Sequence, residues 1–534
     1  MKKDQLTTFI MIAGVVGVWL VATPGQAKDA RELPNIIYIL ADDMGYGDVS
    51  ALNPNSKIHT PNIDRLANDG MYFSDAHSGS SVCTPTRYGI LTGRYCWRTR
   101  LKSQVLWNYD NSLMDASRLN VATYLKEHGY NTAMIGKWHL GLDWASKSNP
   151  GEITSKEDDV DFTKPFRNGP IDMGFDWFYG INASLDMPPY LFLEQDMATT
   201  QPTGKVQKKA FGRVGMADEK LSADDFLPAF TQKAVSYIQS QDKSTPFFLY
   251  FPLNAPHTPI APSKAFQGSS KLEGKLGEYA DFCIEVDDTV GQILTALEEG
   301  GLRKNTLVIF TADNGCAYYI GVKEFEERGH FPSGIYKGYK GGTFDGGHRV
   351  PFLVQWPAVI QPGTQNNQTI GLNDLLATCA ELIGAKLPED AGEDSLSFLA
   401  ALHGKDIDVS SRKAVVHHDY RGDFAIRKGR WKLLAKADAG LGYKEEEFAE
   451  GVHLYDMDAD PGENNNVASQ YPERVQELTE LLEQYKHEGR SVRRDYESFE
   501  VNFTRTTWMN NAIGTPRAVP TLNPAKIRDS AFPC

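Results

Sequence analysis

The stretch Ile36-Ile37-Tyr38-Ile39-Leu40 leads directly into the acidic pair Asp42-Asp43. An uninterrupted apolar run of this kind is typical of a strand buried on both faces, as in a parallel sheet. Three later apolar runs also lead into polar residues: Thr132–Ile135 into Lys137 and His139, Phe247–Phe251 towards His257, and Leu307–Phe310 into Asp313 and Asn314. Open α/β sheets bind ligands at the carboxyl ends of their strands, so we expect these polar side chains to gather at one edge.

Helical patterns lie between the apolar runs. We expect helices near Asn62–Asn68, where Thr60-Pro61 favours a helix start, and over about Ala116–His128. A longer helix is predicted over about Glu278–Glu299, because its apolar residues recur every three or four positions. This alternation predicts the α/β class, with a large, mostly parallel sheet flanked by helices.

A change of composition divides the chain. Residues 387–411 are richer in Gly, Asp and Ser and are interpreted as a connection. Short strand-like runs follow at Ala414–His417 and Trp431–Leu434, and an amphipathic helix is expected over about Glu473–Lys486. We therefore predict a main domain over residues 28–400. Residues 401–534 are predicted to form a smaller α+β domain, with a small antiparallel sheet, a helix and a tail.

Residues 1–27 have the pattern of a secretory signal peptide. Lys2 and Lys3 precede the apolar stretch Phe9–Ala22, and Gly25-Gln26-Ala27 provides a small-residue cleavage site. We expect the protein to be exported, either periplasmic or secreted, with no stable membrane insertion after cleavage. The alternative is an uncleaved anchor, although the apolar stretch is short for a membrane span.

Charge and cysteine content restrict the function further. The formal net charge of -14 argues against binding to nucleic acid or to an anionic membrane, both of which require basic surface. Six cysteines in 534 residues are too few for a disulfide scaffold, although some could pair in an oxidising compartment.

The most informative motif is Cys83-Thr84-Pro85-Thr86-Arg87, followed by Leu91-Thr92-Gly93-Arg94. A Cys on a Pro-containing turn that opens a helix, with an Arg one turn later, suits anion chemistry, because the helix N-terminus offers free N–H groups. One alternative is a buried structural thiol. Another is a thiolate phosphatase, but its loop has five residues between Cys and Arg, whereas this motif has three.

On these residues the chain resembles the sulfatase family, whose signature is Cys or Ser, any residue, Pro, a small residue and Arg, and then a Leu-Thr-Gly-Arg block. Thr86 stands where Ser is commonest in that signature. The resemblance is to arylsulfatase-like, Cys-type members, and it implies an alkaline-phosphatase-like fold. It also implies that Cys83 is converted by a formylglycine-generating maturation enzyme to 3-oxoalanine (formylglycine).

The acidic pair Asp42-Asp43 and the pair Asp313-Asn314 offer hard oxygen ligands, which favour calcium or magnesium over zinc. Taken alone, such pairs are usually solvated turns. The resemblance implies that they are ligands of one Ca²⁺ ion, together with residue 83.

Three further blocks supply cations. Gly136-Lys137-Trp138-His139 matches the family's Lys-x-His block, Pro256-His257 its Pro-His block, and Lys340 its sulfate-binding lysine, although Asp345 replaces the commoner Glu nearby. The resemblance therefore implies that Arg87, Lys137, His139, His257 and Lys340 are catalytic with residue 83, and that Lys137, His257 and Lys340 contact the substrate. Three other histidines match no catalytic block and are expected at the surface or against substrate: His348, His417 and His418.

The expected reaction is hydrolysis of a sulfate monoester, which needs a strong nucleophile, cations around the sulfate oxygens and an acid for the departing alcohol. The resemblance implies that hydrated formylglycine attacks sulfur, that His257, with Lys340, protonates the alcohol, and that His139 takes the proton that regenerates the aldehyde. Export and the bulky loops between Ala145 and Lys208 suggest a sulfated carbohydrate, such as a marine or host polysaccharide. The alternatives are a phosphodiesterase or phosphonate monoester hydrolase on the same fold, and a nonenzymatic glycan-binding protein.

Overall fold

Strand β1 (Asn35–Ala41) lies inside the main sheet, and all seven of its residues are buried. It pairs in parallel with β12 (Phe247–Pro252) on one side and with β13 (Thr306–Ala312) on the other. Every residue of these three strands is buried. Both faces of the sheet are therefore covered at this point, as the continuous apolar runs predict.

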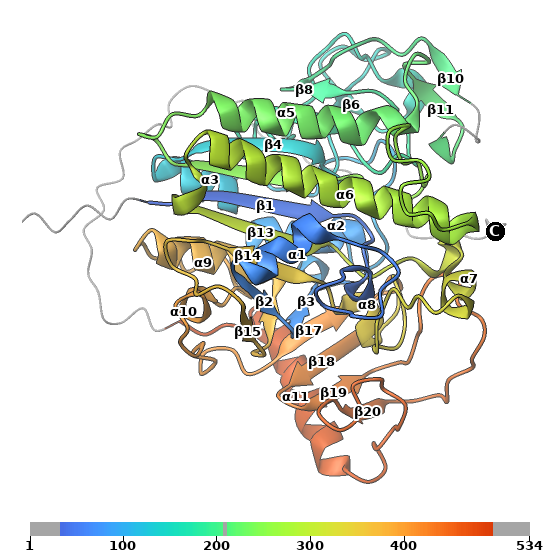
Figure 1. The fold of residues 1–534 in the computed structure, drawn as a ribbon, viewed down its shortest axis with the longest axis vertical. Coiled ribbons are helices and arrows are strands. Elements are labelled where there is room, and N and C mark those ends of the chain that lie inside the picture. Colours follow the sequence, from blue (N-terminus) through green and yellow to red (C-terminus); the bar gives the residue numbers. More distant parts are fainter. Residues whose placement is uncertain (1–32, 207–210, 495–534) are drawn as a thin grey trace, which may run out of the picture. The chain divides into compact units, whose positions relative to one another are not determined.

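The main sheet has ten strands and is mixed, with a mostly parallel centre (Figure 1). Its order is β15 (Thr364–Asn366), β2 (Met71–Phe73), β14 (Phe352–Gln355), β13, β1, β12, β4 (Asn131–Lys137), β7 (Trp177–Ile181), β8 (Leu193–Glu194) and β9 (Met197–Ala198). From β13 to β7 all neighbours are parallel, whereas β14 and β8 run antiparallel to the strands beside them. The expected α/β class with a large, mostly parallel sheet is confirmed.

Two groups of helices pack around this sheet. The first is α1 (Pro61–Asn68), α5 (Phe226–Ser240) and α6 (Gly274–Glu299), and α5 and α6 run side by side in Figure 1. The second is α2 (Cys83–Thr92), α3 (Val121–Glu127) and α9 (Leu375–Leu382), which contact one another. Shorter helices are α7 (Val322–Glu327), α8 (Asp345–His348) and α10 (Leu399–Leu402).

Helix boundaries differ from the sequence expectation at two places. The helix expected over 116–128 is shorter, because the side chain of Asn120 accepts hydrogen bonds from the N–H groups of Ala122 and Thr123 and so begins α3 at Val121. Helix α6 begins one turn earlier than expected, and its first turn buries Leu276 against the core.

The second sheet is antiparallel and has the order β17 (Val415–His418), β18 (Phe424–Lys428), β19 (Trp431–Leu434) and β20 (His453–Asp456). Helix α11 (Pro472–Glu488) contacts β18 and β19 through an apolar face that includes Leu478 and Leu482. This is the small antiparallel sheet with a helix that the sequence predicts. Three two-stranded sheets complete the set: β3 (Ala76–His77) with β16 (Ile370–Gly371), β5 (Trp144–Ala145) with β6 (Ile153–Thr154), and β10 (Gly204–Val206) with β11 (Gly215–Ala217).

The computed structural model describes residues 33–206 and 211–494. The predicted signal peptide at 1–27 and Cys534 lie outside these residues. Within them, no helix has both the length and the apolarity needed to cross a membrane, and the five cysteines are free thiols.

The expectation that His348, His417 and His418 lie at the surface or against substrate is wrong in its first part, because all three are at most 1% exposed. The rings of His348 and His417 lie 4.7 Å apart between centroids, and the ring of His77 lies 4.9 Å from that of His417. Burial lowers the pKa of His348 and His417 well below the ordinary range, so these rings are neutral. β17 meets the loop before Cys83 at this point, where His418 pairs with Ser80. This long-range packing cannot be read from single residues in the sequence.

Candidate active site

Cys83 is the first residue of α2, and Val82 before it is extended, with φ of -143°. The Cys83 side chain is 2% exposed, and its Sγ lies 3.7 Å from Oδ1 of Asp42. Burial raises the pKa of the Cys83 thiol to about 12, although the nearby Lys137 and Lys340 oppose this. The thiol is therefore neutral at pH 7, which argues against a thiolate nucleophile.

Arg87 lies one turn after Cys83 and is fully buried. Its Nε and Nη2 donate to Oδ2 of Asp313 at 3.1 and 2.8 Å, and its Nη1 donates to the carbonyl of Lys137 at 3.0 Å. The guanidinium thus ties α2 to the ends of β13 and β4. A planar group with several fixed donors suits such bridging, and lysine could not replace it.

The acidic residues of the two predicted pairs meet because β1 and β13 are parallel and in register, with Ala41 opposite Ala312. Asp42 and Asp313 follow these positions directly. The backbone N–H of Asp43 donates to Oδ1 of Asp313 at 3.2 Å. The amide nitrogen of Asn314 donates to Oδ1 of Asp43 at 2.7 Å.

Two buried lysines face these carboxylates. Nζ of Lys137 donates to Oδ2 of Asp42 at 2.6 Å, and Nζ of Lys340 donates to Oδ2 of Asp43 at 2.8 Å. Burial alone would raise the pKa of Asp42, but Lys137 and the other cations around it hold it well below the ordinary value. Burial would likewise lower the pKa of Lys340, yet Asp43 keeps it well above the usual range. Asp42 is therefore ionised and Lys340 protonated at neutral pH.

Two histidines border the same cluster. Nε2 of His139 lies 3.0 Å from the carbonyl of Leu106, and its Nδ1 is buried with no partner among the described residues. Burial, with Lys137 and Arg87 nearby, lowers the pKa of His139 well below 6.5. Since a carbonyl can only accept, Nε2 carries the proton and Nδ1 has a free lone pair. Nε2 of His257 lies 3.6 Å from Oδ2 of Asp43.

The backbone at this edge is strained at two non-glycine residues. Asp43 has φ of 66° and His139 has φ of 56°, a left-handed conformation that costs a residue with a Cβ about 1–3 kcal/mol. Gly136, with φ of 121°, lies so close to the carbonyl of Pro252 that a Cβ would stand 1.9 Å from its oxygen. Conformations of this kind persist where a site holds side chains in fixed directions.

The structure brings all ten sequence-predicted site residues to one edge of the sheet. They are Asp42, Asp43, Cys83, Arg87, Lys137, His139, His257, Asp313, Asn314 and Lys340. One ligand atom from each of Asp42, Asp43, Cys83 and His257 lies within 4.8 Å of the others. Oδ1 of Asn314 is buried and has no partner among the described residues. The carboxylate oxygens of Asp42 and Asp43 and the amide oxygen of Asn314 are hard donors that fit a calcium ion, whereas the sulfur of Cys83 and the nitrogen of His257 are not.

Two residues near this edge were not singled out from the sequence. Asp186 follows β7, the strand beside β4, and Tyr319 follows β13 by seven residues. Asp186 could have been found by the same rule that indicates Asp42, since it also lies beyond the carboxyl end of a parallel strand. Tyr319 belongs to a short 3-10 turn, Tyr318–Ile320, that gives no periodic signal.

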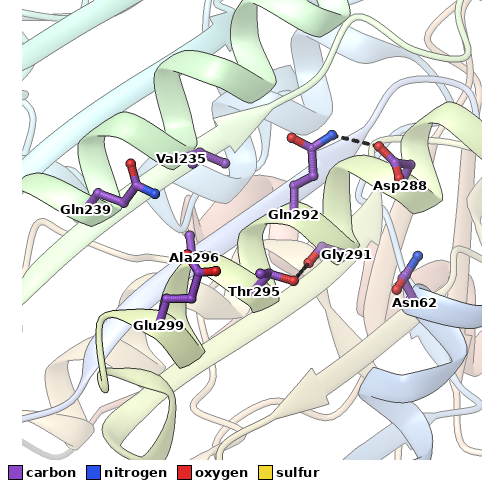
Figure 2. A pocket seen from close by; sticks show the side chains of 9 residues that line it. All are labelled: Asn62, Val235, Gln239, Asp288, Gly291, Gln292, Thr295, Ala296 and Glu299. Atoms are coloured by element: carbon purple, nitrogen blue, oxygen red, sulfur yellow. Dashed lines mark hydrogen bonds between the residues drawn. The ribbon is translucent and has the colours of Figure 1, made fainter. Parts of the chain in front are cut away.

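A separate pocket of about 340 Å³ lies between α5 and α6 (Figure 2). Its lining includes the acidic Asp288 and Glu299 and no Lys, Arg or His. Its polar groups partly satisfy one another, because Nε2 of Gln292 donates to Oδ2 of Asp288 at 2.7 Å (Figure 2). Without a basic side chain, this pocket does not suit an anionic substrate.

Comparison with known proteins agrees with this geometry. A family model described as Sulfatase matches residues 34–385, and one described as N-sulphoglucosamine sulphohydrolase, C-terminal, matches residues 339–488. An N-acetylgalactosamine-6-O-sulfatase from Bacteroides thetaiotaomicron is 36% identical over 497 residues, covering 85% of this chain and 93% of the relative. Human arylsulfatase A is 33% identical over 84% of this chain and 87% of its own length. A solved structure from a study of glycosaminoglycan metabolism by Bacteroides thetaiotaomicron superposes with a TM-score of 0.74 at 34% identity, covering 85% of this chain and all of that one.

Proposed function

The chain belongs to the sulfatase family, and we propose that this enzyme releases inorganic sulfate from a sulfated carbohydrate by means of a residue made from Cys83. The observation that carries the proposal is the position of Cys83 at the start of α2, with Arg87, Lys137 and Lys340 around it. A sulfate monoester needs such an arrangement, since cations must stabilise the negative charge that builds on its oxygens.

The substrate class is proposed from two relatives. The similar Bacteroides thetaiotaomicron protein is named for N-acetylgalactosamine 6-sulfate, and the solved structure at 34% identity comes from work on glycosaminoglycans. We therefore take a 6-O-sulfated N-acetylgalactosamine, within a polysaccharide or at its end, as the first substrate to test.

Position 83 fits a formylglycine. The Cys83 thiol is neutral and buried, so the unmodified side chain would be a poor nucleophile. Its Sγ lies beside the carboxylate of Asp42, which is one of the proposed calcium ligands. Formylglycine, when present, supplies a hydrated aldehyde whose hydroxyl can attack sulfur. Because Cys83 is 2% exposed in the folded chain, we propose that the maturation enzyme acts before folding is complete.

The residues that would hold calcium are Asp42, Asp43, Asp313 and Asn314, together with residue 83. Their oxygens are hard donors, and the free amide oxygen of Asn314 supports the assignment. Calcium, when bound, supplies positive charge that activates the nucleophile and stabilises the sulfate oxygens.

Three cationic side chains have distinct proposed tasks. Arg87 is held by Asp313 and by the carbonyl of Lys137, so it fixes the direction of the first turn of α2 and of residue 83. Lys137 brings an ammonium group to Asp42 and Lys340 brings one to Asp43, where both can bind sulfate oxygens.

The two histidines are proposed to move protons. Nδ1 of His139 has a free lone pair and can accept a proton, since Nε2 donates to the carbonyl of Leu106. Nδ1 of His257 lies 2.7 Å from the carbonyl of Thr258 and therefore carries a hydrogen. Its Nε2 is then the nitrogen that can protonate the departing alcohol when the ring is an imidazolium, which carries a second proton at Nε2.

The test combines a mass measurement with an activity measurement. The protein is produced with and without a formylglycine-generating enzyme, and the peptide containing residue 83 is weighed. The matured protein should carry an aldehyde there and release sulfate from N-acetylgalactosamine 6-sulfate, whereas the unmatured protein should do neither. Faster hydrolysis of an aryl phosphate diester or a phosphonate monoester than of any sulfate ester would contradict the proposal in favour of those activities.

Two features of the whole chain complete the proposal. We propose that residues 1–27 direct export to the periplasm or beyond, which would give the enzyme access to extracellular polysaccharide. We also propose that residues 28–400 form the catalytic domain and residues 401–534 a smaller domain. In support, the four-stranded sheet of residues 415–456 and α11 share an apolar cluster, which Tyr95 and Trp97 of the proposed catalytic domain join.

A further inference from the structure

Asp186 lies in the loop that follows β7, beside the catalytic edge of the sheet. Strand β7 pairs in parallel with β4, with Ile181 opposite Lys137. The next residue, Asn182, accepts a hydrogen bond at its carbonyl from the N–H of His139 at 2.7 Å. This loop therefore leaves the sheet next to the proposed base.

The same loop packs against the residue before Cys83. Ala183 and Met187 form a small apolar cluster with Val82 and Val105, and Trp107 packs on its side. Asp186 thus belongs to a segment that contacts both sides of the site: His139 through Asn182, and the start of α2 through Val82.

An arginine holds one part of Asp186 in place. Nη1 of Arg213 donates to the carbonyl of Asp186 at 2.8 Å and to its Oδ2 at 2.9 Å. The guanidinium of Arg213 lies over the ring of Trp107, 5.0 Å from its centroid. The other carboxylate oxygen, Oδ1, is buried and has no hydrogen-bond partner among the described residues.

The chain around Arg213 is shaped for this contact. Gly212 has φ of 94°, and a Cβ there would lie 3.0 Å from the Cβ of Asp186, so only glycine allows this approach without strain. The preceding Phe211 stacks on Tyr190 at 4.3 Å between centroids, and the hydroxyl of Tyr190 donates to the carbonyl of Arg213 at 3.1 Å. Asp186 and Arg213 are therefore fixed by packing and not only by their mutual charge.

Tyr319 lies in the segment after β13, where the carbonyl of Cys316 accepts a hydrogen bond from the N–H of Lys340 at 2.9 Å. Tyr319 is 45% exposed and the Asp186 side chain is 20% exposed, although its Oδ1 is itself buried, and Cys83 is 2% exposed.

The Asp186 carboxylate, held by Arg213, favours a hydroxyl group on the substrate. A carboxylate with one oxygen held by an arginine and one oxygen free accepts hydrogen bonds and repels anions. A sulfate or carboxylate substituent on the substrate would be disfavoured there, whereas a sugar hydroxyl would donate to Oδ1.

We propose that Asp186 determines specificity by accepting a hydrogen bond from a free ring hydroxyl of the sugar that carries the scissile sulfate, with Arg213 as its positioning residue. This inference rests on the proposed function, because it assumes a sulfated sugar at the same site. It implies that the enzyme rejects sugars in which that hydroxyl is missing or is itself sulfated.

The test compares two proteins on a set of matched substrates. The wild-type protein and Asp186→Ala are assayed on N-acetylgalactosamine 6-sulfate and on its 3-deoxy and 4-deoxy analogues. In the wild-type protein, kcat/KM should fall about 10- to 100-fold on the analogue that lacks the contacted hydroxyl, as expected for a lost hydrogen bond to a charged group. In Asp186→Ala the penalty for the same analogue should shrink to less than about threefold, because the partner is gone.

Two controls separate this inference from the proposed function. Asp69 also forms an ion pair with an arginine, Arg303, at 2.7 Å, and Asp69→Ala should leave the analogue penalty unchanged. The same comparison is repeated by measuring binding affinity in the Cys83→Ser background, because a binding measurement needs no catalysis.

Sulfate release by the wild-type protein tests the proposed function by itself. The inference is overturned if both deoxy analogues lose the same factor in Asp186→Ala as in the wild-type protein, or if Asp186→Ala does not weaken binding of N-acetylgalactosamine 6-sulfate to the Cys83→Ser protein.

Discussion

Replacing His418 with Asn is expected to reduce the pH dependence of stability by a calculable amount. His418 ends β17 and is 1% exposed. Its Nδ1 lies 3.2 Å from the carbonyl of Gly79, so Nδ1 carries the hydrogen, and its Nε2 is buried without a partner among the described residues. Protonation would place a charged N–H in this position, and burial therefore lowers the pKa of His418 from 6.5 to about 4.

The sign and size of the effect follow from the difference between the pKa of His418 in the unfolded chain and its pKa in the folded chain. Between pH 6.5 and about 4 the unfolded chain binds a proton at His418 that the folded chain does not, so stability falls as the pH decreases. The contribution is fully present above pH 6.5. It decreases by about 2 kcal/mol at about pH 5, and by about 3 kcal/mol once the pH is below about 4.

The assay is equilibrium urea unfolding of the wild-type protein and His418→Asn at several pH values between about 7.5 and 5. Asn can donate to the carbonyl of Gly79 from nearly the same place as Nδ1, but it does not titrate. The difference between the two proteins also cancels other groups, such as Asp419, whose pKa is raised to about 6 by burial and which acts in the opposite direction. The reasoning is refuted if the free-energy difference between the two proteins is the same at both ends of this range.

Three other predictions concern the buried charges and the site. Lys432 is fully buried between Asp345, at 2.7 Å, and a second carboxylate, so Lys432→Met should lower the free energy of unfolding in urea by about 3–5 kcal/mol. The control Lys486→Met removes a partly exposed ion pair and should lower it by less than about 1 kcal/mol. Equal losses would contradict the pairing argument. His139→Gln should lower kcat at least about 100-fold with little change in KM, because it removes a proton acceptor; a change confined to KM would rule out that role. Added calcium should raise the thermal midpoint of the wild-type protein and restore activity after chelation, and Asn314→Leu should lose the thermal response; a protein indifferent to chelation would disprove the metal assignment.

Much of the site could be predicted because strand ends in a parallel sheet converge. Asp42 and Asp313 each follow an apolar run, and the register of β1 and β13 brings them together. The same rule applies to Lys137 at the end of β4. The cationic residues beyond these strands, such as Lys340, are indicated only by the resemblance to the sulfatase family.

Other features depend on long-range packing and could not be predicted. The left-handed backbone of Asp43 and His139 is set by contacts around the sheet edge, since neither residue type requires it. His348 and His417 are polar residues in a region without clear periodicity, so their burial follows only from the way β17 packs. The position of Asp186 depends on a glycine turn that lies 26 residues later in the chain, at Gly212.

The central claim is that sulfate release requires a residue made from Cys83. The most direct test measures inorganic sulfate released from N-acetylgalactosamine 6-sulfate by the wild-type protein and by Cys83→Ala, both produced with a formylglycine-generating enzyme and both checked for folding by circular dichroism. We expect release by the wild-type protein and none by the folded variant. Release at a comparable rate by folded Cys83→Ala would contradict the account.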